Sequence, residues 1–323
     1  MMVKYDYLKP ASIEETLGLL QRFRNKAVLV AGGTDVIVGI RQKKLAPQVL
    51  ISLKGLNGFD HIERDDQRVR IGSLSTHRKV AESLLIRESF SALSDAARHV
   101  GSPQIRNVAT LGGNISNGLP SADTACPLLV FNTQVKITGP RGERVLPLDQ
   151  FFIGPRKTAL QSDEILLEFI IPPLPSHSGS CYRKLARRQA MELPVLGIAM
   201  LLAVDIVNAE PLKEALEREA AIEKLQDALD QSEIYCREAR IALGVVAPTP
   251  IRAKGAEAVL KGARMTTETL REAGEKASKE AQPRDTVRGA AWFRTEMIRV
   301  LPRRLAMTCL ERILSLGQET GRM

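Results

Sequence analysis

Aromatic side chains are scarce in this sequence of 323 residues, where Phe, Trp and Tyr together make up 4%. A core must therefore be packed mainly from Leu, Ile, Val and Ala, and hydrophobic residues at 44% of the chain are sufficient for that. The scarcity also argues against a surface on which the bases of single-stranded nucleic acid stack, because such surfaces need several exposed rings.

Cysteine is equally sparse, with four residues that lie far apart and form no CxxC pair. A disulfide framework, a zinc site or an iron–sulfur site would need more closely spaced ligands. We therefore expect reduced, buried thiols and no metal on this chain. The four thiols belong to Cys126, Cys181, Cys236 and Cys309.

Histidine and the common catalytic motifs are also lacking. The four histidines show no HExxH or similar ligand spacing, and we interpret each as a surface or helix-capping residue: His61, His77, His99 and His177. The absence of GxGxxG and GxxxxGK(S/T) argues against a Rossmann domain and a P-loop NTPase, and the absence of GxSxG against a serine hydrolase. We assign no catalytic acid, base or nucleophile.

No apolar run is long enough to cross a bilayer, since the best one, "VLGIAMLLAV" at 195–204, is too short. The first residues, "MMVKYDYLKP", lack the apolar core of a signal peptide. We expect a cytoplasmic protein without a transmembrane segment.

The formal net charge is +9, which would suit a nucleic acid or another acidic partner if the charge were clustered. Most basic residues are instead dispersed among apolar ones, with local concentrations at 182–188 and 299–306. An ordinary solvated surface is favoured, a docking face for an acidic partner subunit comes next, and nucleic-acid binding comes last.

The length predicts two or three compact units. Helix and strand patterns alternate in residues 1–55 and again in residues 56–175. The stretch "PPLPSHSGS" at 172–180 is dense in Pro, Ser and Gly and is the predicted domain boundary. A third unit, 178–323, begins with two strand patterns and ends with helices.

Several local elements follow from their spacing. Ser12 and Glu15 have the spacing of a capping box at the start of a helix, and 140–142 should be the turn of a hairpin. In the C-terminal helix, Pro302 should produce a kink or begin a new helix. Residues 211–233 form a predicted helical insertion, read either as a cover for the sheet, which we favour, or as a partner-docking element.

Two glycine pairs stand out. "AGGTDV" at 31–36 follows a strand pattern and precedes a helix pattern, and "TLGGN" at 110–114 lies in a second predicted turn. Glycine allows positive φ and close approach of backbone N–H groups to a ligand, and a helix start next to it adds a positive dipole end. One such pair is most often a plain turn. Two pairs together could hold the diphosphate of a dinucleotide.

The segments "AGGTDV" and "SPQIRNVATLGGNISNGLPSADTACPLL" closely resemble the FAD-binding medium subunit of molybdenum hydroxylases, the family that includes xanthine dehydrogenase, carbon monoxide dehydrogenase and 4-hydroxybenzoyl-CoA reductase. "YRKLARRQAMELPVLGIAM" and "ALGVVAPTPIRAKGAEAVL" resemble the C-terminal domain of that subunit. The resemblance implies an α+β fold. Two FAD-binding subdomains of the vanillyl-alcohol-oxidase (PCMH) type, 1–55 and 56–175, would precede a smaller α+β domain with an antiparallel sheet and helices.

The resemblance also implies FAD between the subdomains and assigns cofactor-binding residues by position. Asp123 would hydrogen-bond the cofactor, although from sequence alone it could equally cap the helix that follows. Without the resemblance, Leu166 would be assigned to the core and Lys184 to the surface. Val100 stands where some relatives carry an aromatic residue, which puts ring stacking there in doubt. The implied residues are Leu29, Val30, Ala31, Gly32, Gly33, Thr34, Asp35, Val100, Thr110, Leu111, Gly112, Gly113, Asn114, Asp123, Leu166 and Lys184.

The implied function is that of an oxidoreductase subunit. A partner with the molybdenum cofactor and a small partner with two [2Fe-2S] clusters would complete the complex, as a dimer of heterotrimers, and FAD would pass electrons to an acceptor such as NAD or a quinone. The insertion at 211–233 is longer than the family leads us to expect. Two alternatives stay open: a self-sufficient flavin oxidase of the same fold, and a basic, non-redox protein that binds RNA or a phosphorylated ligand.

Overall fold

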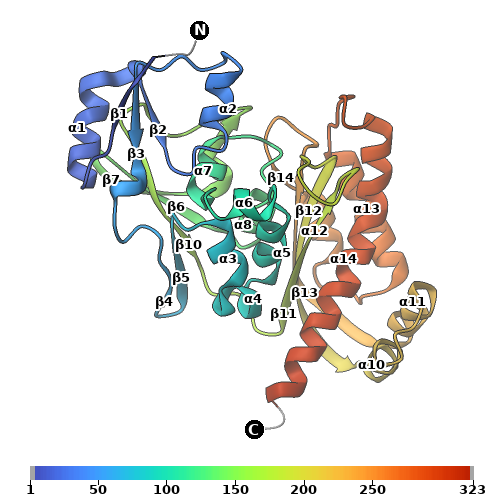
Figure 1. Ribbon diagram of the computed structural model, residues 1–323. Coiled ribbons are helices and arrows are strands. Elements are labelled where there is room, and N and C mark those ends of the chain that lie inside the picture. Colours follow the sequence, from blue (N-terminus) through green and yellow to red (C-terminus); the bar gives the residue numbers. More distant parts are fainter. Residues whose placement is uncertain (1–3, 321–323) are drawn as a thin grey trace.

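The computed structural model describes residues 4–320, and its strands form three main sheets that follow one another along the chain (Figure 1). The first part of the chain, residues 6–55, contains a parallel sheet in the order β1–β3–β2. Every residue of its central strand is buried, and successive side chains point to opposite faces: Val49 and Ile51 toward Leu20 of α1, and Leu50 toward Ile40 of α2. The elements are β1 (Asp6–Leu8), α1 (Ile13–Phe23), η1 (Arg24–Lys26), β2 (Ala27–Val30), α2 (Val36–Arg41), β3 (Val49–Ser52) and η2 (Leu53–Gly55).

The second part of the chain, residues 62–171, contains a five-stranded antiparallel sheet in the order β4–β5–β10–β6–β7. The predicted hairpin is confirmed, since Gly139 pairs with Gly142 at the end of β6 and β7. Helices α3, α5 and α8 lie against this sheet and share its core. The elements are β4 (Ile62–Asp65), β5 (Arg68–Gly72), α3 (His77–Glu82), α4 (Leu84–Ser89), α5 (Ser91–His99), α6 (Pro103–Arg106), α7 (Leu111–Ser116), α8 (Ala125–Val130), β6 (Gln134–Gly139), β7 (Gly142–Pro147), α9 (Leu148–Phe151), β8 (Phe152–Gly154), β9 (Lys157–Thr158) and β10 (Ile165–Ile171).

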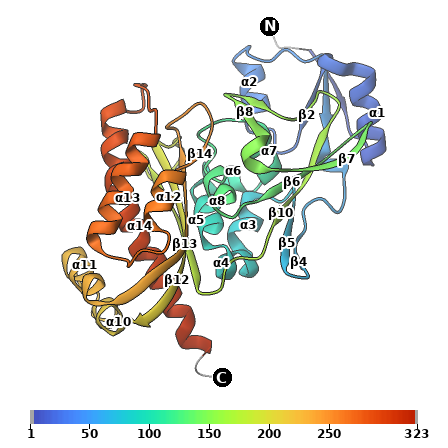
Figure 2. The same ribbon diagram turned by 180° about the vertical axis from the view of Figure 1, so that it is seen from behind.

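The third part of the chain, residues 178–320, contains an antiparallel sheet in the order β11–β12–β13–β14. Helices α12, α13 and α14 cover one face, and α5 and α8 of the second part lie against the other, as Figures 1 and 2 both show. The predicted α+β fold with an antiparallel C-terminal sheet is confirmed. The elements are β11 (Ser178–Leu185), β12 (Leu196–Asn208), α10 (Glu210–Glu217), α11 (Ile222–Gln231), β13 (Glu233–Gly244), β14 (Ile251–Arg252), α12 (Lys254–Leu260), α13 (Thr267–Glu280) and α14 (Ala291–Thr320).

Alternation along β12 explains why both faces of this sheet are buried. Ile198 and Met200 point into the core shared with α14, while Ala199 and Leu201 point into the core of the second part. A strand that is buried on both faces needs apolar residues at successive positions, which explains the continuous apolar run at 195–204. The second and third parts therefore share a hydrophobic interface.

Two C-terminal expectations have clear outcomes. Pro302 lies inside one continuous helix, α14, so the alternative that a new helix begins there is wrong. The predicted insertion forms α10 and α11, which bury Leu212 and Leu229 in the C-terminal core. This burial supports the reading as a cover. Within residues 4–320, no helix combines the length and the apolar character that a membrane span requires.

Candidate cofactor site

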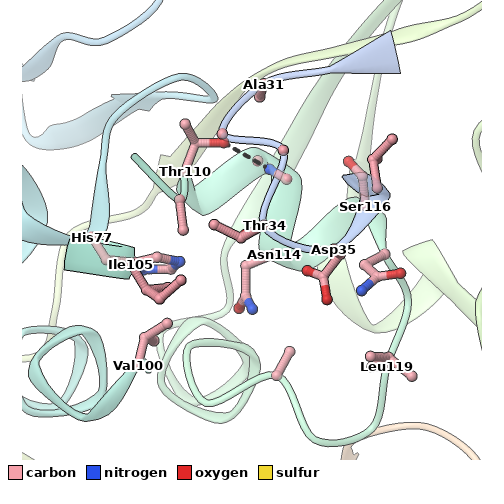
Figure 3. Close-up of a pocket in the computed structure, with 18 of the residues that line it drawn as sticks. Ala31, Thr34, Asp35, His77, Val100, Ile105, Thr110, Asn114, Ser116 and Leu119 are labelled. Carbon is pink, nitrogen blue, oxygen red and sulfur yellow. Dashed lines mark hydrogen bonds between the residues drawn. The ribbon is translucent and has the colours of Figure 1, made fainter. Parts of the chain in front are cut away.

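A cavity of about 480 Å³ lies where the three parts of the chain meet. This volume is within the range of roughly 300–1,000 Å³ that is usual for ligand sites. Residues of all three parts line it, including both glycine segments, as Figure 3 shows in part. All of the predicted cofactor-binding residues line the cavity except Val30 and Leu111, which are buried behind its wall.

The first glycine segment is a loop between β2 and α2 that leaves its amides free. Gly33 has a φ of +75°, which other residues rarely adopt. A Cβ atom on Gly32 would collide with the Val108 carbonyl oxygen and lie 2.8 Å from the Ala109 Cα. Gly32 is thus required by contact between two chain segments rather than by a ligand. Among the described residues, the amides of residues 32–35 have no hydrogen-bond acceptor, so they can donate to a bound group.

The second glycine segment differs from its prediction. It is the first turn of α7, not a turn between elements, and the Thr110 hydroxyl caps it by accepting from the Gly113 amide at 3.1 Å. The amides of Leu111 and Gly112 donate to Ser75 and Ser73, so they are already used. The Asn114 backbone amide donates to the Thr110 carbonyl, so the amides of residues 111–114 all have acceptors within the chain and are not free to bind another group.

What the second segment offers is a side chain. Thr124 donates a hydrogen bond of 2.8 Å to the Asn114 Oδ1 atom. This contact orients the amide and leaves the Asn114 Nδ2 group as a donor. Asn114 lines the cavity near Thr34 and Asp35 of the first segment (Figure 3). The two segments therefore contribute different donors to one space, backbone amides from the first and a side-chain amide from the second.

A buried polar network closes another side of the cavity. Asp123 accepts hydrogen bonds from the Tyr182 hydroxyl at 2.7 Å and from the Lys184 Nζ at 2.8 Å, and Lys184 also donates to the His99 carbonyl at 3.1 Å. Thr124, not Asp123, occupies the cap position of α8. The alternatives of a helix cap for Asp123 and a surface position for Lys184 are thus wrong, because both side chains are more than nine-tenths buried.

This network carries charge in a region of low dielectric. Burial raises the pKa of the Asp123 carboxyl above its ordinary value, and Lys184 and Tyr182 oppose that rise. Burial and the nearby Asp123 raise the pKa of the Tyr182 hydroxyl well above its usual range, so it stays protonated and donates. The network also ties β11 to the second part of the chain.

Apolar side chains form the remaining walls. Val100 and Leu166 are buried at the cavity surface, and Leu29 is half-buried there. Leu166, in β10, belongs to the core as the pattern predicts, and it also lines the cavity. Mixed apolar walls with a few polar groups are typical of dinucleotide and other small-molecule sites.

Sequence reasoning missed residues at the site. His77 was interpreted as a surface or capping residue, but its side chain is fully buried at the cavity wall, and Thr76 is the cap of α3. Nothing in the spacing of His77 indicated this burial. Met191, Glu192 and Leu193, in the loop after β11, also line the cavity, and nothing in their spacing indicated it.

Two family models together match most of the chain. The model described as the FAD binding domain in molybdopterin dehydrogenase matches residues 3–174. The model described as the CO dehydrogenase flavoprotein C-terminal domain matches residues 180–309. The resemblance inferred from the glycine segments is thereby confirmed.

Individual relatives match over nearly their whole length. The putative xanthine dehydrogenase FAD-binding subunit of Escherichia coli K12 is 33% identical over 301 residues, which is 93% of this chain and 94% of that one. The nicotinate dehydrogenase FAD-subunit of Eubacterium barkeri is 32% identical over 273 residues, 83% of each chain. Among solved structures, a chain of carbon monoxide dehydrogenase from Hydrogenophaga pseudoflava aligns with a TM-score of 0.84 at 26% identity, covering 97% of this chain and 99% of that one.

Proposed function

The chain belongs to the FAD-binding subunits of the molybdopterin dehydrogenases, which are oxidoreductases, and from that premise we propose that it carries electrons between two [2Fe-2S] clusters of a small subunit and an external acceptor. NAD and a quinone are the acceptors that we propose. The observation that carries the site assignment is a convergence at one cavity of suitable size: backbone amides without an acceptor in the described part of the chain, an oriented Asn114 and a buried Lys184 all line it.

We assign the residues roles according to the groups they present. The amides of residues 32–35 bind the diphosphate, since unpartnered N–H groups in a glycine loop are suitable donors to phosphate oxygens. Asn114 donates to the same part of the cofactor. Lys184, fixed by Asp123, faces the flavin end, and Val100, Leu29 and Leu166 provide apolar surface for the rings. Val30 and Leu111, which are buried next to the two glycine segments, support the backbone of those segments.

Bound FAD supplies the chemistry, because a flavin can take up electrons singly and release them in pairs. The chain itself binds the cofactor and orients it. No acid, base or nucleophile of the chain is assigned to the reaction.

The partner assignment rests on the relatives. A similar chain, 26% identical, is named the medium chain of carbon monoxide dehydrogenase of Hydrogenophaga pseudoflava. We propose that this chain likewise joins a large subunit with the molybdenum cofactor and a small iron–sulfur subunit, in a dimer of heterotrimers. Within the chain, residues 1–55 and 56–175 are proposed as the two FAD-binding subdomains and 178–323 as the C-terminal domain.

Purification of the chain with its native partners tests this function. We expect a brown complex, coloured by flavin and iron–sulfur clusters together, that releases one FAD per chain on denaturation and contains iron and molybdenum. When the organic substrate is mixed rapidly with the complex, the iron–sulfur absorbance should bleach no later than the flavin absorbance. A complex that releases no flavin would refute the cofactor assignment, and flavin reduction that needs no iron–sulfur subunit would favour a self-sufficient oxidase.

A further inference from the structure

One buried side chain at the cavity, that of His77, belongs to neither glycine segment nor to the Asp123–Lys184 network. His77 is the first residue of α3, and its backbone amide donates to the Ala109 carbonyl at 3.0 Å, next to the second glycine segment. Its side chain is fully buried and lines the cavity. Figure 3 shows the ring beside Ile105 and Val100, with Thr34 and Asn114 across from it.

Neither ring nitrogen of His77 has a hydrogen-bond partner among the described residues. By contrast, both ring nitrogens of His61 have partners, the Gly58 carbonyl and the Glu168 carboxylate. A buried nitrogen without a partner costs free energy, and native proteins rarely leave such a group unsatisfied. Because His77 lines the cavity, we expect the missing partner to come from a group that binds there.

The charge state of the ring restricts what that partner can be. Burial and, secondarily, the positive charge of Arg106 lower the pKa of His77 to about 4, so the ring is neutral near pH 7. A neutral imidazole has one donor and one acceptor nitrogen. The adjoining side chains of Val100 and Ile105 are apolar. An uncharged polar group, such as a sugar hydroxyl or the edge of a heterocycle, suits this surrounding better than a phosphate.

Building on the proposed function, we propose that His77 is a cofactor-binding residue whose neutral imidazole hydrogen-bonds an uncharged polar group of FAD. The diphosphate is left to the amides of residues 32–35. The cofactor thereby satisfies the buried ring, and the ring in turn adds affinity that the glycine loop alone does not provide.

The variant His77→Leu tests this inference in the full chain stripped of flavin. Leu removes the polar nitrogens and keeps an apolar side chain, so the flavin-free protein should unfold at the same or a higher urea concentration. Its Kd for FAD, measured by quenching of flavin fluorescence, should rise about ten- to a hundredfold, because a buried polar group of the cofactor loses its partner. His61→Leu, the same change away from the cavity, should leave the Kd for FAD unchanged.

Binding of FMN and of ADP, which represent the flavin and adenosine halves of FAD, shows which half carries the group that His77 contacts. The fragment that carries it should bind more weakly to His77→Leu, and the other fragment should bind equally to both proteins. If the variant does not fold, the imidazole ¹⁵N chemical shifts of the wild-type protein decide: His77 signals should shift on addition of FAD.

Wild-type affinity for FAD retained by His77→Leu, or unchanged His77 signals, would overturn the inference while leaving the proposed function intact. Failure of the wild-type chain to bind FAD would instead refute the proposed function itself.

Discussion

At the scale of single residues, the buried pair of Asp123 and Lys184 should contribute strongly to stability. Removal of one partner from a buried ion pair leaves an uncompensated charge and typically costs about 3–5 kcal/mol. Lys184→Met should therefore lower the free energy of unfolding by about that amount, since the side chains of both partners are more than nine-tenths buried. Urea unfolding of the full chain measures the change.

The double variant Asp123→Asn with Lys184→Met is the matched control. It removes both charges, so most of the lost stability should return. A double variant that is less stable than the Lys184→Met variant would show that the two side chains do not act as a pair.

His77 gives a pH dependence whose sign follows from its lowered pKa. The ring titrates at about 4 in the folded chain, against 6.5 for an unperturbed histidine, because of burial and the nearby Arg106. Between these values the unfolded state binds more protons, so this contribution to stability is complete above pH 6.5 and is lost as the pH falls toward 4. The loss amounts to about 3 kcal/mol.

Urea unfolding of the flavin-free chain at pH 7, 6, 5 and 4 tests that sign. The wild-type chain should lose more stability than His77→Leu over this range, since other acid-sensitive groups are common to both proteins. Parallel pH profiles would contradict a buried, neutral His77.

At the scale of elements, the contact between the β2–α2 loop and residues 108–109 should tolerate no side chain at position 32. A methyl group there would meet the Val108 carbonyl and the Ala109 Cα, which are backbone atoms and cannot rotate away. Gly32→Ala should therefore cost about 3 kcal/mol in urea unfolding. Gly18→Ala in α1 is the matched control: it has open space and should stabilise by about 0.5–1 kcal/mol. Equal stabilities for the two variants would be incompatible with this packing.

Elements with local signals could be predicted from the sequence. The Ser12 hydroxyl accepts from the Glu15 amide at 3.1 Å, as the capping box predicts, and the hairpin turn falls at its predicted place. The second glycine pair could not be assigned correctly, because glycine is a poor helix former. Contacts with Ser73 and Ser75, which are distant in sequence, hold it in the first turn of α7. Tertiary hydrogen bonds of this kind leave no periodic signal.

The site residues likewise divide into those that a local sequence pattern indicates and those whose role depends on the assembled fold. The glycine loop at 31–36 could be recognised as a potential anion site from its own residues. Asp123 and Lys184 were assigned only through the resemblance, since their pairing depends on how β11 packs against α8. Neither the local pattern nor the resemblance indicated His77, because burial of a polar ring at a cavity depends on the assembled fold.

At the scale of the whole molecule, the cavity depends on all three parts of the chain. The first part contributes the free amides, the second Asn114 and Asp123, and the third Lys184 and the loop with Met191. The shared core along β12 holds the second and third parts together. We therefore expect neither 1–175 nor 178–323 alone to provide the complete set of cavity residues.

A structure of the FAD-loaded chain, by crystallography or as part of the complex by electron cryo-microscopy, tests the central claim most directly. The account predicts density for the diphosphate within hydrogen-bond distance of the amides of residues 32–35, with the cofactor filling the cavity between Asn114 and Lys184. FAD bound elsewhere on the chain, with those amides facing only solvent, would contradict it.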